Sequence, residues 1–395
     1  MNTNLNDFTA SILQENDLIC FCHLRWNSVF QRPHHLMTRF SKQTRVFWVE
    51  EPVFDDEDTL EIVKVEKSLW IITPHLRQGL NEYEITQQKK EMMNYLLTAM
   101  NINKFASWYY TPMFLPATRH MKPIFKVYDC MDELSAFKNA PQALKLLEQE
   151  MFDSVDIVFT GGFSLYHAKK NTHYNVHPFP SSIDKHHFEQ ARTMSEDPAD
   201  QKDIPHPRFG FYGVLDERFD IELIESVAKT KPEWQFVMLG PVVKIDQESL
   251  PKLSNIHYLG GKKYDELPQY LAGWDIALVP FALNESTKYI SPTKTPEYLS
   301  GGKPVISTPI TDVVNPYQKY KLVHIASDAD QFIRFATEEL EKSDEEHTHW
   351  LKRVDAFLAH QSWDKTWQEM VQLMEETYKG EMSDKNVKEK QKKYV

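Results

Sequence analysis

The stretch SPTKTPEYLSGGKPVIS, residues 291–307, places a lysine and a glutamate at the start of a short predicted helix. Proline is favoured at the first helical position, because the N–H that it lacks would be unpaired there. Ser291–Pro292 and Thr295–Pro296 are therefore two candidate starts, each a capping residue followed by proline. On either start, Lys294 and Glu297 lie at the amino end of the helix.

The chemistry that this arrangement suits is the binding of a nucleoside diphosphate. Free N–H groups and a partial positive charge at a helix N-terminus attract phosphate, and Lys294 adds a full charge. The Glu297 carboxylate suits the two hydroxyls of a ribose. Gly301–Gly302 then ends the helix before the apolar KPVIST run. The alternative is a capped surface helix with an incidental charge pair.

The same segment resembles the donor-site segment of GT-B glycosyltransferases, in the form SPxKxxEYLAxGKPVV of bacterial polysaccharide enzymes of the family 4 type. The stretch QRPHHLMTRFSKQTRVFWVEEP resembles the opening βαβ unit of the teichuronic-acid-type transferases. Four further stretches resemble parts of the GT-B enzymes in the right order: VDIVFTGGFSLYHAKK, FPSSIDKHHF, FGFYGVLDERFDIELI and NIHYLGGKKYDELPQYLAGWDIALVPF. The likeness covers roughly residues 17–370. It implies an α/β GT-B fold with two Rossmann-like doubly wound domains, an interdomain cleft, and C-terminal helices that pack back on the N-terminal domain.

The resemblance also implies roles in donor binding for residues of the C-terminal half. It assigns the phosphates to Lys294, Arg218 and Gly213, the ribose to Glu297, and the border of the base pocket to Tyr258, Gly260 and Lys262. Arg218 is equally typical of a surface arginine at a helix start.

One position departs from the retaining enzymes of family 4, which usually carry a Glu-x7-Glu pair. Tyr289 stands eight residues before Glu297, and the nearest acid, Glu285, is out of register. The first acid of the pair is therefore missing, and retention or inversion stays open.

A second acid, in KVYDCMDELSAF, is a candidate base. This segment resembles VYRASDGLSTI of the xanthan glucuronosyltransferase, an inverting GT-B enzyme, and the resemblance assigns the catalytic base to Asp132. Inversion needs one base to take the proton of the acceptor hydroxyl. We expect Asp129 and Asp132 just past a strand end, facing the cleft. The alternative is a helix N-cap at Asp132, with Asp129 as a turn former.

The acceptor side is expected in CHLRWNSVFQRPHHL, which follows the first strand. Trp26 could stack on a sugar face, and Arg25 and Arg32 could bind a phosphate or carboxylate. His34 and His35 are adjacent and so point different ways on a helix, and no third ligand is visible. We therefore expect no metal, and no cofactor besides the nucleotide-sugar donor.

The elements that position these residues alternate between apolar runs and amphipathic stretches, which is typical of βαβ units. Predicted strands are LICFCHL, TRVFWVEEP, FASWYY, IFKVYDC, DIVFTGG, RFGFYG, WQFVMLG, NIHYLG, DIALVPF, KPVIST and KLVHIAS. Predicted helices are ITQQKKEMMNYLLTAM, APQALKLLEQEMF and a long C-terminal region that breaks near Gln361 and Ser362.

These elements divide the chain into parts. We expect an N-terminal acceptor-binding domain over residues 1–185 and a C-terminal nucleotide-sugar-binding domain over 186–360. Residues 361–395 would form a helix crossing back to the first domain and a basic tail. The polar stretch 189–207 is typical of a linker between the halves.

The bulk composition excludes several classes of protein. With 395 residues and a net charge of -12, the chain is long enough for two domains and is no general nucleic-acid binder. Three cysteines form no disulfide framework, and no signal peptide or membrane span is visible, so we expect a cytoplasmic protein. The tail KNVKEKQKKYV is either a solvated end or a contact with the anionic inner surface of the membrane.

The sequence thus predicts a hexosyltransferase that moves a sugar from a nucleoside-diphosphate donor, UDP rather than GDP, to a cell-surface polysaccharide or lipid-linked glycan. Two alternatives stay open. One is an enzyme like the UDP-sugar 2-epimerases, which share the fold and need no acceptor. The other is a non-catalytic subunit that binds a nucleotide sugar or scaffolds a partner transferase.

Overall fold

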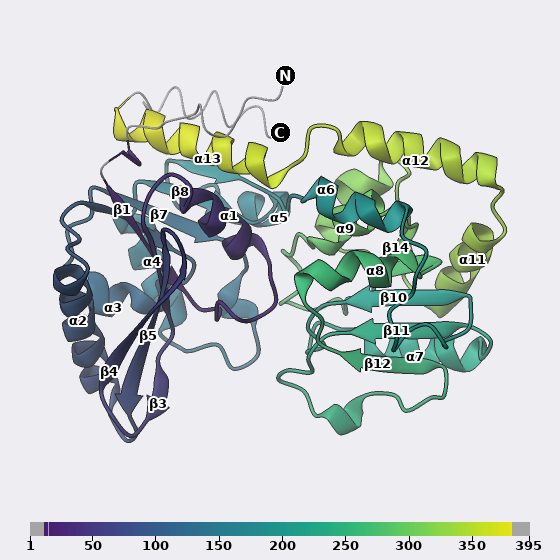
Figure 1. The fold of residues 1–395 in the computed structure, drawn as a ribbon, viewed down its shortest axis with the longest axis horizontal. Helices are drawn as coiled ribbons and strands as arrows, with labels where there is room; N and C mark the ends of the chain where they lie inside the picture. The colour runs from purple at the N-terminus through teal and green to yellow at the C-terminus, as the bar shows by residue number, and fades with distance from the viewer. Residues whose placement is uncertain (1–11, 15, 381–395) are drawn as a thin grey trace. The chain divides into compact units, whose positions relative to one another are not determined.

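The computed structural model describes residues 12–14 and 16–380, and the chain forms two compact units (Figure 1). Unit 1 comprises Met1–Pro180 and Trp363–Val395, and unit 2 comprises Ser181–Ser362. The boundaries lie after Pro180 and after Ser362, where the sequence suggested 185 and 360. The basic tail, with its predicted membrane contact, lies outside the described residues.

Unit 1 is built on a nine-stranded sheet in the order β3-β5-β2-β1-β6-β7-β8-β9, with β4 paired to β5. Its strands are β1 Asp17–Cys22, β2 Val46–Glu50, β3 Val53–Asp55, β4 Thr59–Glu66, β5 Leu69–Arg77, β6 Phe105–Tyr109, β7 Phe125–Cys130, β8 Ile157–Thr160 and β9 Val176–Pro178. Only β4 runs antiparallel to its neighbour among the described pairs. The five strands predicted for this half are confirmed, whereas β3, β4, β5 and β9 were not predicted.

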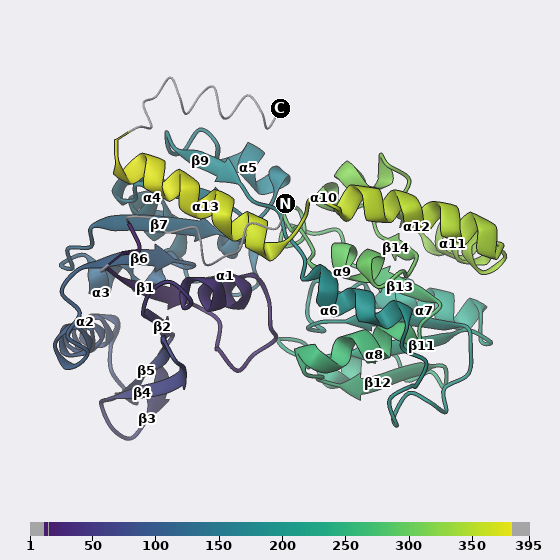
Figure 2. The same cartoon turned by 45° about the horizontal axis from the view of Figure 1, so that its top comes forward.

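The helices of unit 1 cover both faces of this sheet. They are α1 Arg32–Phe40, α2 Glu82–Ala99, α3 Leu115–Thr118, α4 Leu144–Ser154, α5 Phe163–Lys169 and α13 Trp363–Tyr378, with 3₁₀ turns η2 Pro112–Phe114 and η3 Leu134–Ala136. Figure 2 shows α13 beside α1. The ring of His35 stacks on Trp363 at 4.7 Å, and Trp363 and Trp367 are fully buried in the core. The predicted return of the C-terminal helix to the first domain is therefore confirmed.

Unit 2 contains a parallel six-stranded sheet in the order β12-β11-β10-β13-β14-β15. Its strands are β10 Arg208–Tyr212, β11 Gln235–Leu239, β12 Ile256–Gly260, β13 Ile276–Val279, β14 Val305–Ser307 and β15 His324–Ile325. All six were predicted. In chain order this is 3-2-1-4-5-6, the order of a doubly wound dinucleotide-binding fold.

The helices of unit 2 range from the three-residue α10 to the fifteen-residue α12. They are α6 Lys185–Glu189, α7 Ile221–Thr230, α8 Leu267–Ala272, α9 Lys294–Ser300, α10 Thr311–Val313, α11 Ala329–Leu340 and α12 Asp344–Leu358, with the turns η4 Gln190–Arg192, η5 Gln247–Ser249, η6 Tyr264–Glu266 and η7 Val314–Gln318. The C-terminal helical region breaks between α12 and α13, as predicted.

The predicted linker at 189–207 is wrong, because this stretch lies wholly inside unit 2. Arg192 forms a bidentate ion pair with Asp355 of α12, and Gln201 is fully buried and accepts a hydrogen bond from the Trp274 indole. The polar residues that suggested a linker therefore hold this segment against the unit's own core.

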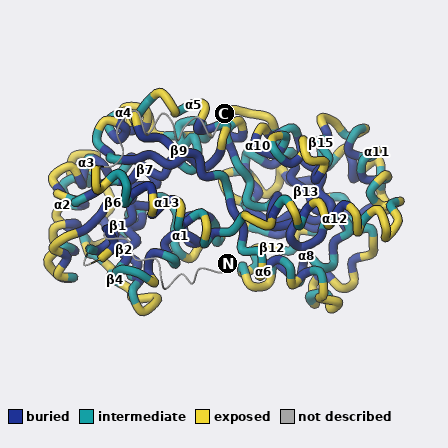
Figure 3. The backbone as a smooth tube through the Cα atoms, turned by 90° about the horizontal axis from the view of Figure 1, so that it is seen from above, coloured by how far each residue is buried: buried dark blue, intermediate teal, exposed yellow. Residues whose placement is uncertain are grey.

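The central strands of both sheets are buried, as the dark blue parts of the tube in Figure 3 show, whereas the edge strands β3, β4, β12 and β15 are partly exposed. In β1 and β2 every residue is buried, which explains why parallel strands read as unbroken apolar runs. Cys20 and Cys22 belong to the same core cluster, so they face one side of the sheet as expected. Among the described residues, no helix has the length and apolarity needed to cross a membrane.

Candidate active site

Lys294 lies where the strand order of unit 2 reverses, between β10 and β13. In doubly wound sheets ligands bind at this switch point, beyond the carboxyl ends of the strands. The Lys294 Nζ is 5.4 Å from the ring centre of Phe211, in β10, and 5.4 Å from that of Phe281, which follows β13. The lysine therefore spans the two strand ends that form the switch point.

Gly213 makes room for this lysine. A Cβ at Gly213 would come within 2.4 Å of Lys294 Cε and 2.8 Å of its Nζ. The neighbouring strand also ends in glycine, and a Cβ at Gly240 would lie 1.8 Å from the Gly213 carbonyl oxygen. Both glycines have positive φ, +141° and +145°, which side chains rarely adopt. The structure thus brings together Lys294 and Gly213, two of the predicted phosphate-binding residues.

Helix α9 begins at Lys294, after Thr293, so neither predicted start is correct. Thr293 already has helical dihedral angles and its side chain makes no capping bond, which explains why the Ser-Pro and Thr-Pro signals misplaced the start. Lys294 and Glu297 nevertheless lie in the first turn, as predicted. Gly302, with φ of +77°, follows the helix end, also as predicted.

Glu297 points into the protein and is only 4% exposed. The Tyr212 hydroxyl donates a hydrogen bond of 2.8 Å to Glu297 Oε2. Burial raises the pKa of Glu297 to about 7, while Tyr212 and Lys294 act in the opposite direction and Asp184 adds to the rise. The predicted ribose ligand is therefore a buried carboxylate that shares its helix turn with the predicted phosphate ligand.

Arg218 lies on the loop that follows β10 and forms a bidentate pair with Asp216, with bonds of 3.0 Å to Oδ1 and 2.6 Å to Oδ2. Its carbonyl accepts a hydrogen bond from the Ala282 N–H, so the loop lies beside the segment after β13. Asp216 is 4% exposed. Arg218 is thus held at the edge that carries Lys294, with part of its charge neutralised.

The three predicted base-pocket residues lie at the end of β12 but do not converge. The Tyr258 hydroxyl donates to the Pro251 carbonyl, and the Lys262 ammonium pairs with Asp200 at 2.6 Å. Gly260 accepts from the Gly240 N–H, and an added Cβ there would meet nothing within 4 Å. Space is therefore open beside Gly260, whereas the Tyr258 and Lys262 side chains bind Pro251 and Asp200 and do not border a common pocket.

A small pocket of about 260 Å³ opens beyond β13 and β14. Glu285, the acid that is out of register with the retaining pair, lies on its wall next to Lys288, 3.9 Å away. The other lining residues are Leu283, Asn284, Thr287, Pro309, Ile310 and Thr311. The pocket adjoins the segment that begins with Phe281 and so lies on the same edge as Lys294.

In unit 1, Asp132 lies in the loop between β7 and η3 and is partly exposed. Asp129, expected beside it past the strand end, instead lies inside β7 and is fully buried. The Arg32 guanidinium donates to both oxygens of Asp129, at 2.8 and 3.1 Å, and to the Phe179 carbonyl. The structure therefore places Arg32 and Asp129 in a buried ion pair and does not bring Arg32 to the acceptor side.

A second ion cluster holds the Asp132 loop. Lys169, on α5, binds Glu133 at 2.8 Å and Glu148, on α4, at 2.7 Å. The Tyr128 hydroxyl donates to the same Glu148. Because Glu133 is the residue next to Asp132, these contacts fix where the Asp132 backbone lies.

The segment after β1 packs as an aromatic group. Trp26 lies 5.0 Å from the His34 ring and 5.1 Å from the Trp48 ring. Burial lowers the pKa of His34 to about 4, so this ring is neutral; its Nδ1 accepts from the Gln31 N–H and its Nε2 donates to the Trp26 carbonyl. Trp26 keeps partial exposure.

Arg25 binds Glu50 at 2.9 Å and keeps a side chain 39% exposed. Of the three predicted acceptor residues, Trp26 and Arg25 are thus partly accessible, whereas Arg32 is buried.

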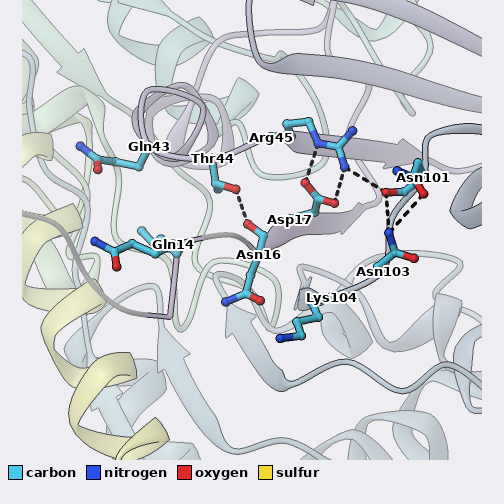
Figure 4. A pocket seen from close by; sticks show the side chains of 10 residues that line it. Gln14, Asn16, Asp17, Gln43, Thr44, Arg45, Asn101, Asn103 and Lys104 are labelled. Atoms are coloured by element: carbon cyan, nitrogen blue, oxygen red, sulfur yellow. Dashed lines mark hydrogen bonds and ion pairs between the residues drawn. The ribbon is translucent and has the colours of Figure 1, made fainter.

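A larger hollow of about 570 Å³ lies at the other edge of the unit 1 sheet, where β1, β2 and β6 begin (Figure 4). Arg45 binds Asp17 at 2.6 Å and the carbonyl of Met100 at 2.9 Å, so these charged groups satisfy one another. The hollow is lined by Leu13, Gln14, Asn16, Asp17, Gln43, Thr44, Arg45, Asn101, Asn103 and Lys104. None of the predicted site residues lines this hollow.

The sequence analysis did not identify three residues that hold predicted site residues in place: Tyr212, Asp216 and Lys169. Tyr212 precedes Gly213 directly, and Asp216 stands two residues before Arg218, so both signals were visible as neighbours of predicted residues. Lys169 comes from a helix distant in sequence, and nothing local indicates it. Within residues 12–14 and 16–380, no three His, Cys, Asp or Glu side chains gather as a metal site.

Residues 218–372 match the family described as "Glycosyl transferase-like". A stretch of 122 residues, 30% of the chain, is 27% identical to the "Putative teichuronic acid biosynthesis glycosyltransferase TuaH" of Bacillus subtilis (strain 168) and spans only 31% of that protein's length. The sucrose-phosphate synthase structure from Thermosynechococcus elongatus has a TM-score of 0.68 at 12% identity, covering 92% of this chain and 100% of that one.

Two further solved structures have the same fold. The structure described as "Trehalose-6-phosphate from E. coli bound with UDP-2-fluoro glucose" has a TM-score of 0.66 at 10% identity and covers 91% of this chain and 99% of that one. WaaG, a glycosyltransferase involved in lipopolysaccharide biosynthesis, has a TM-score of 0.61 at 10% identity over 90% and 99% of the two chains. At these identities the likeness establishes the fold that the chains share.

Proposed function

The chain has the GT-B fold of these glycosyltransferases, and we propose that it transfers a sugar from a nucleoside-diphosphate donor to a glycan. The observation that carries the proposal is the position of Lys294, in the same helix turn as Glu297 and directly over Gly213, at the switch point of unit 2. The Lys294 ammonium, above a strand end where glycine leaves the backbone accessible, suits a diphosphate. The neighbouring Glu297 carboxylate suits the hydroxyls of a ribose.

UDP is the favoured nucleotide. One structure of this fold holds UDP-2-fluoro glucose by its own description. On this proposal Lys294 and Arg218 neutralise the leaving diphosphate, which removes the need for a metal or another cofactor. The pocket lined by Glu285 and Lys288 would lie near the transferred sugar.

The proposed mechanism is inversion with Asp132 as general base. Tyr289 replaces the first acid of the retaining pair, and Asp132 is partly exposed on a loop held by Glu133 and Lys169. The carboxylate would take the proton of the acceptor hydroxyl while that oxygen attacks the anomeric carbon and the diphosphate leaves.

The proposed acceptor is a cell-envelope polysaccharide or a lipid-linked glycan. The curated relative is named for teichuronic acid biosynthesis, and WaaG for lipopolysaccharide biosynthesis. Cys20, Cys22 and Cys130 are buried free thiols, which suits a reducing cytoplasm. Peripheral contact with the inner membrane surface remains part of this proposal.

The test measures release of UDP from a panel of UDP-sugars, with and without a pool of lipid-linked glycan acceptors from a bacterial membrane. We expect release that depends on acceptor and falls by roughly 10²-fold or more in Asp132→Asn, the usual contribution of a general base. Asp153→Asn, an exposed aspartate of α4, is the matched control and should keep the wild-type rate.

Other outcomes would replace parts of the proposal. Conversion of the UDP-sugar alone, with no acceptor present, into a UDP-sugar or a free sugar epimerised at C2 would show an activity like that of the 2-epimerases. Binding of UDP-sugars with no turnover under any condition would favour the non-catalytic subunit, for which the absent first acid is the supporting observation. Near-normal transfer by Asp132→Asn would remove Asp132 as base.

A further inference from the structure

Tyr212 is the residue that fixes the Glu297 carboxylate. Within the described part of the chain, one hydrogen bond reaches this carboxylate, from the Tyr212 hydroxyl to Oε2 at 2.8 Å. The second oxygen, Oε1, receives none from these residues. A carboxylate anchored through one oxygen can present the other to a ligand hydroxyl in a fixed direction.

Tyr212 is itself held rigidly, so it can act as such an anchor. Its N–H donates to the Tyr298 hydroxyl at 3.0 Å, and its ring packs against those of Tyr298, Trp274 and Phe188 at centroid distances of 4.7, 5.9 and 6.2 Å. As the last residue of β10 it also precedes Gly213, which lies under Lys294. One strand end thus supports both predicted donor ligands.

We propose that Tyr212 is a positioning residue that holds Glu297 as a hydrogen-bond acceptor for the donor ribose and makes donor binding depend on pH. The inference rests on the proposed function, since it takes the ribose as the partner of Glu297. It extends that function by identifying a residue that never touches the donor and by stating how protonation controls the site.

The pKa values of Tyr212 and Glu297 decide which of the two groups donates the hydrogen bond between them. Burial raises the pKa of Tyr212 well above its ordinary value, so the hydroxyl keeps its proton and donates. The pKa of Glu297 is raised to about 7 by burial, so this carboxylate gains and loses its proton near neutrality. Tyr212 stabilises the ionised form, because its hydroxyl can donate to a carboxylate.

The other charged groups around Glu297 are few. On its own helix Lys294 favours the ionised form, and at the start of α6 Asp184 opposes it. Of the other charges on the packed elements, Lys185 pairs with Glu189 on α6, and Asp355 of α12 pairs with Arg192. His187 of α6 contacts the Tyr264 carbonyl, whereas His186 of α6 and Lys352 and Arg353 of α12 are exposed. Strands β13 and β14, which also contact α9, carry no charged side chain. Removal of the Tyr212 hydroxyl should therefore shift the titration toward higher pH.

The experiment is calorimetric titration of the β-methyl ester of UDP into the full chain between pH 6 and pH 8.5. This probe has no phosphate group that titrates in the range. For the wild type we expect affinity to rise about tenfold between pH 6 and pH 8, as one carboxyl that titrates near 7 ionises. For Tyr212→Phe we expect weaker binding and a midpoint displaced upward by about one pH unit or more.

Two controls separate positioning from a general loss of structure. Tyr317→Phe removes another buried hydroxyl of unit 2 and should bind as the wild type does at every pH. The 2′,3′-dideoxy form of the probe, with no ribose hydroxyls, should bind the wild type weakly and without the pH dependence. This ligand control needs no variant, so it holds even where Tyr212→Phe folds poorly.

The inference is overturned if the wild type binds the probe with an affinity that does not change with pH, or if Tyr212→Phe keeps the wild-type midpoint. In both cases binding itself still supports the proposed donor site. Failure of the wild type to bind the probe at any pH would instead overturn the proposed function, and the inference with it.

Discussion

Glu297 places a carboxylate at a buried position of unit 2. It is 4% exposed and receives a single hydrogen bond within the described residues. A buried carboxylate in such surroundings disfavours its charged form, and its raised pKa records that cost. A neutral side chain of the same shape would avoid this cost.

Glu297→Gln should therefore stabilise the protein at alkaline pH while weakening donor binding. The folded-state pKa, about 7, lies above the ordinary glutamate pKa of 4.5, so the wild type loses stability as pH rises from 4.5 through 7. The glutamine variant avoids this loss, and its free energy of unfolding at pH 8 should exceed that of the wild type by up to about 3 kcal/mol.

Urea unfolding at pH 5.5 and pH 8 checks this, and the gain should be larger at pH 8. Glu91→Gln, at an exposed glutamate in the middle of α2, is the control and should leave stability nearly unchanged at both pH values. A variant at Glu297 that is less stable than the wild type at pH 8 would show that the carboxylate supports the fold.

At the scale of elements, the Asp132 loop is held on two sides. The Arg32–Asp129 ion pair joins α1 to β7 and to Phe179, at the end of the first segment of unit 1. The Glu133–Lys169 pair ties the loop to α5. These contacts fix a loop that has no regular structure of its own at Asp132.

Asp129→Ala should destabilise unit 1 by about 3–5 kcal/mol, because it leaves the buried Arg32 charge without its partner. Arg119→Ala is the control, since its pair with Glu150 is exposed and such pairs contribute at most about 1 kcal/mol. Chemical denaturation measures both. Equal effects of the two substitutions would mean that Arg32 finds another partner or water, contrary to the packing described above.

The sequence predicted helices and strands well where a local pattern of apolar residues determines the secondary structure. Apolar runs located all six strands of unit 2. Strands β10, β13 and β14 are buried along their whole length, so their sequences are nearly continuous apolar runs. Strand β4 was missed although its sequence, TLEIVKVE, alternates apolar and polar residues, which is the pattern of a half-exposed strand. The segment 189–207 was taken for a linker because its polar residues find partners, such as Asp355 and Trp274, that lie far along the chain.

For the whole molecule, the sequence predicted two doubly wound domains and the crossing of the last helix, and the structure has both. It assigned Lys294 and Gly213 to one phosphate site, and the structure brings the two residues together at the β10 end, while their role in binding stays a prediction. It could not indicate that Asp216 neutralises part of Arg218, or that Arg32 is buried against Asp129, because both depend on side-chain packing.

The central claim is that unit 2 binds a nucleoside diphosphate through Lys294. The most direct test is calorimetric titration of UDP and of GDP into the wild type and into Lys294→Ala, with Lys229→Ala, an exposed lysine in the last turn of α7, as the matched control. The account predicts micromolar UDP binding by the wild type and the control, weaker GDP binding, and a loss of about tenfold or more in Lys294→Ala. Equal UDP affinity in Lys294→Ala and wild type, or no binding of either nucleotide, would contradict it.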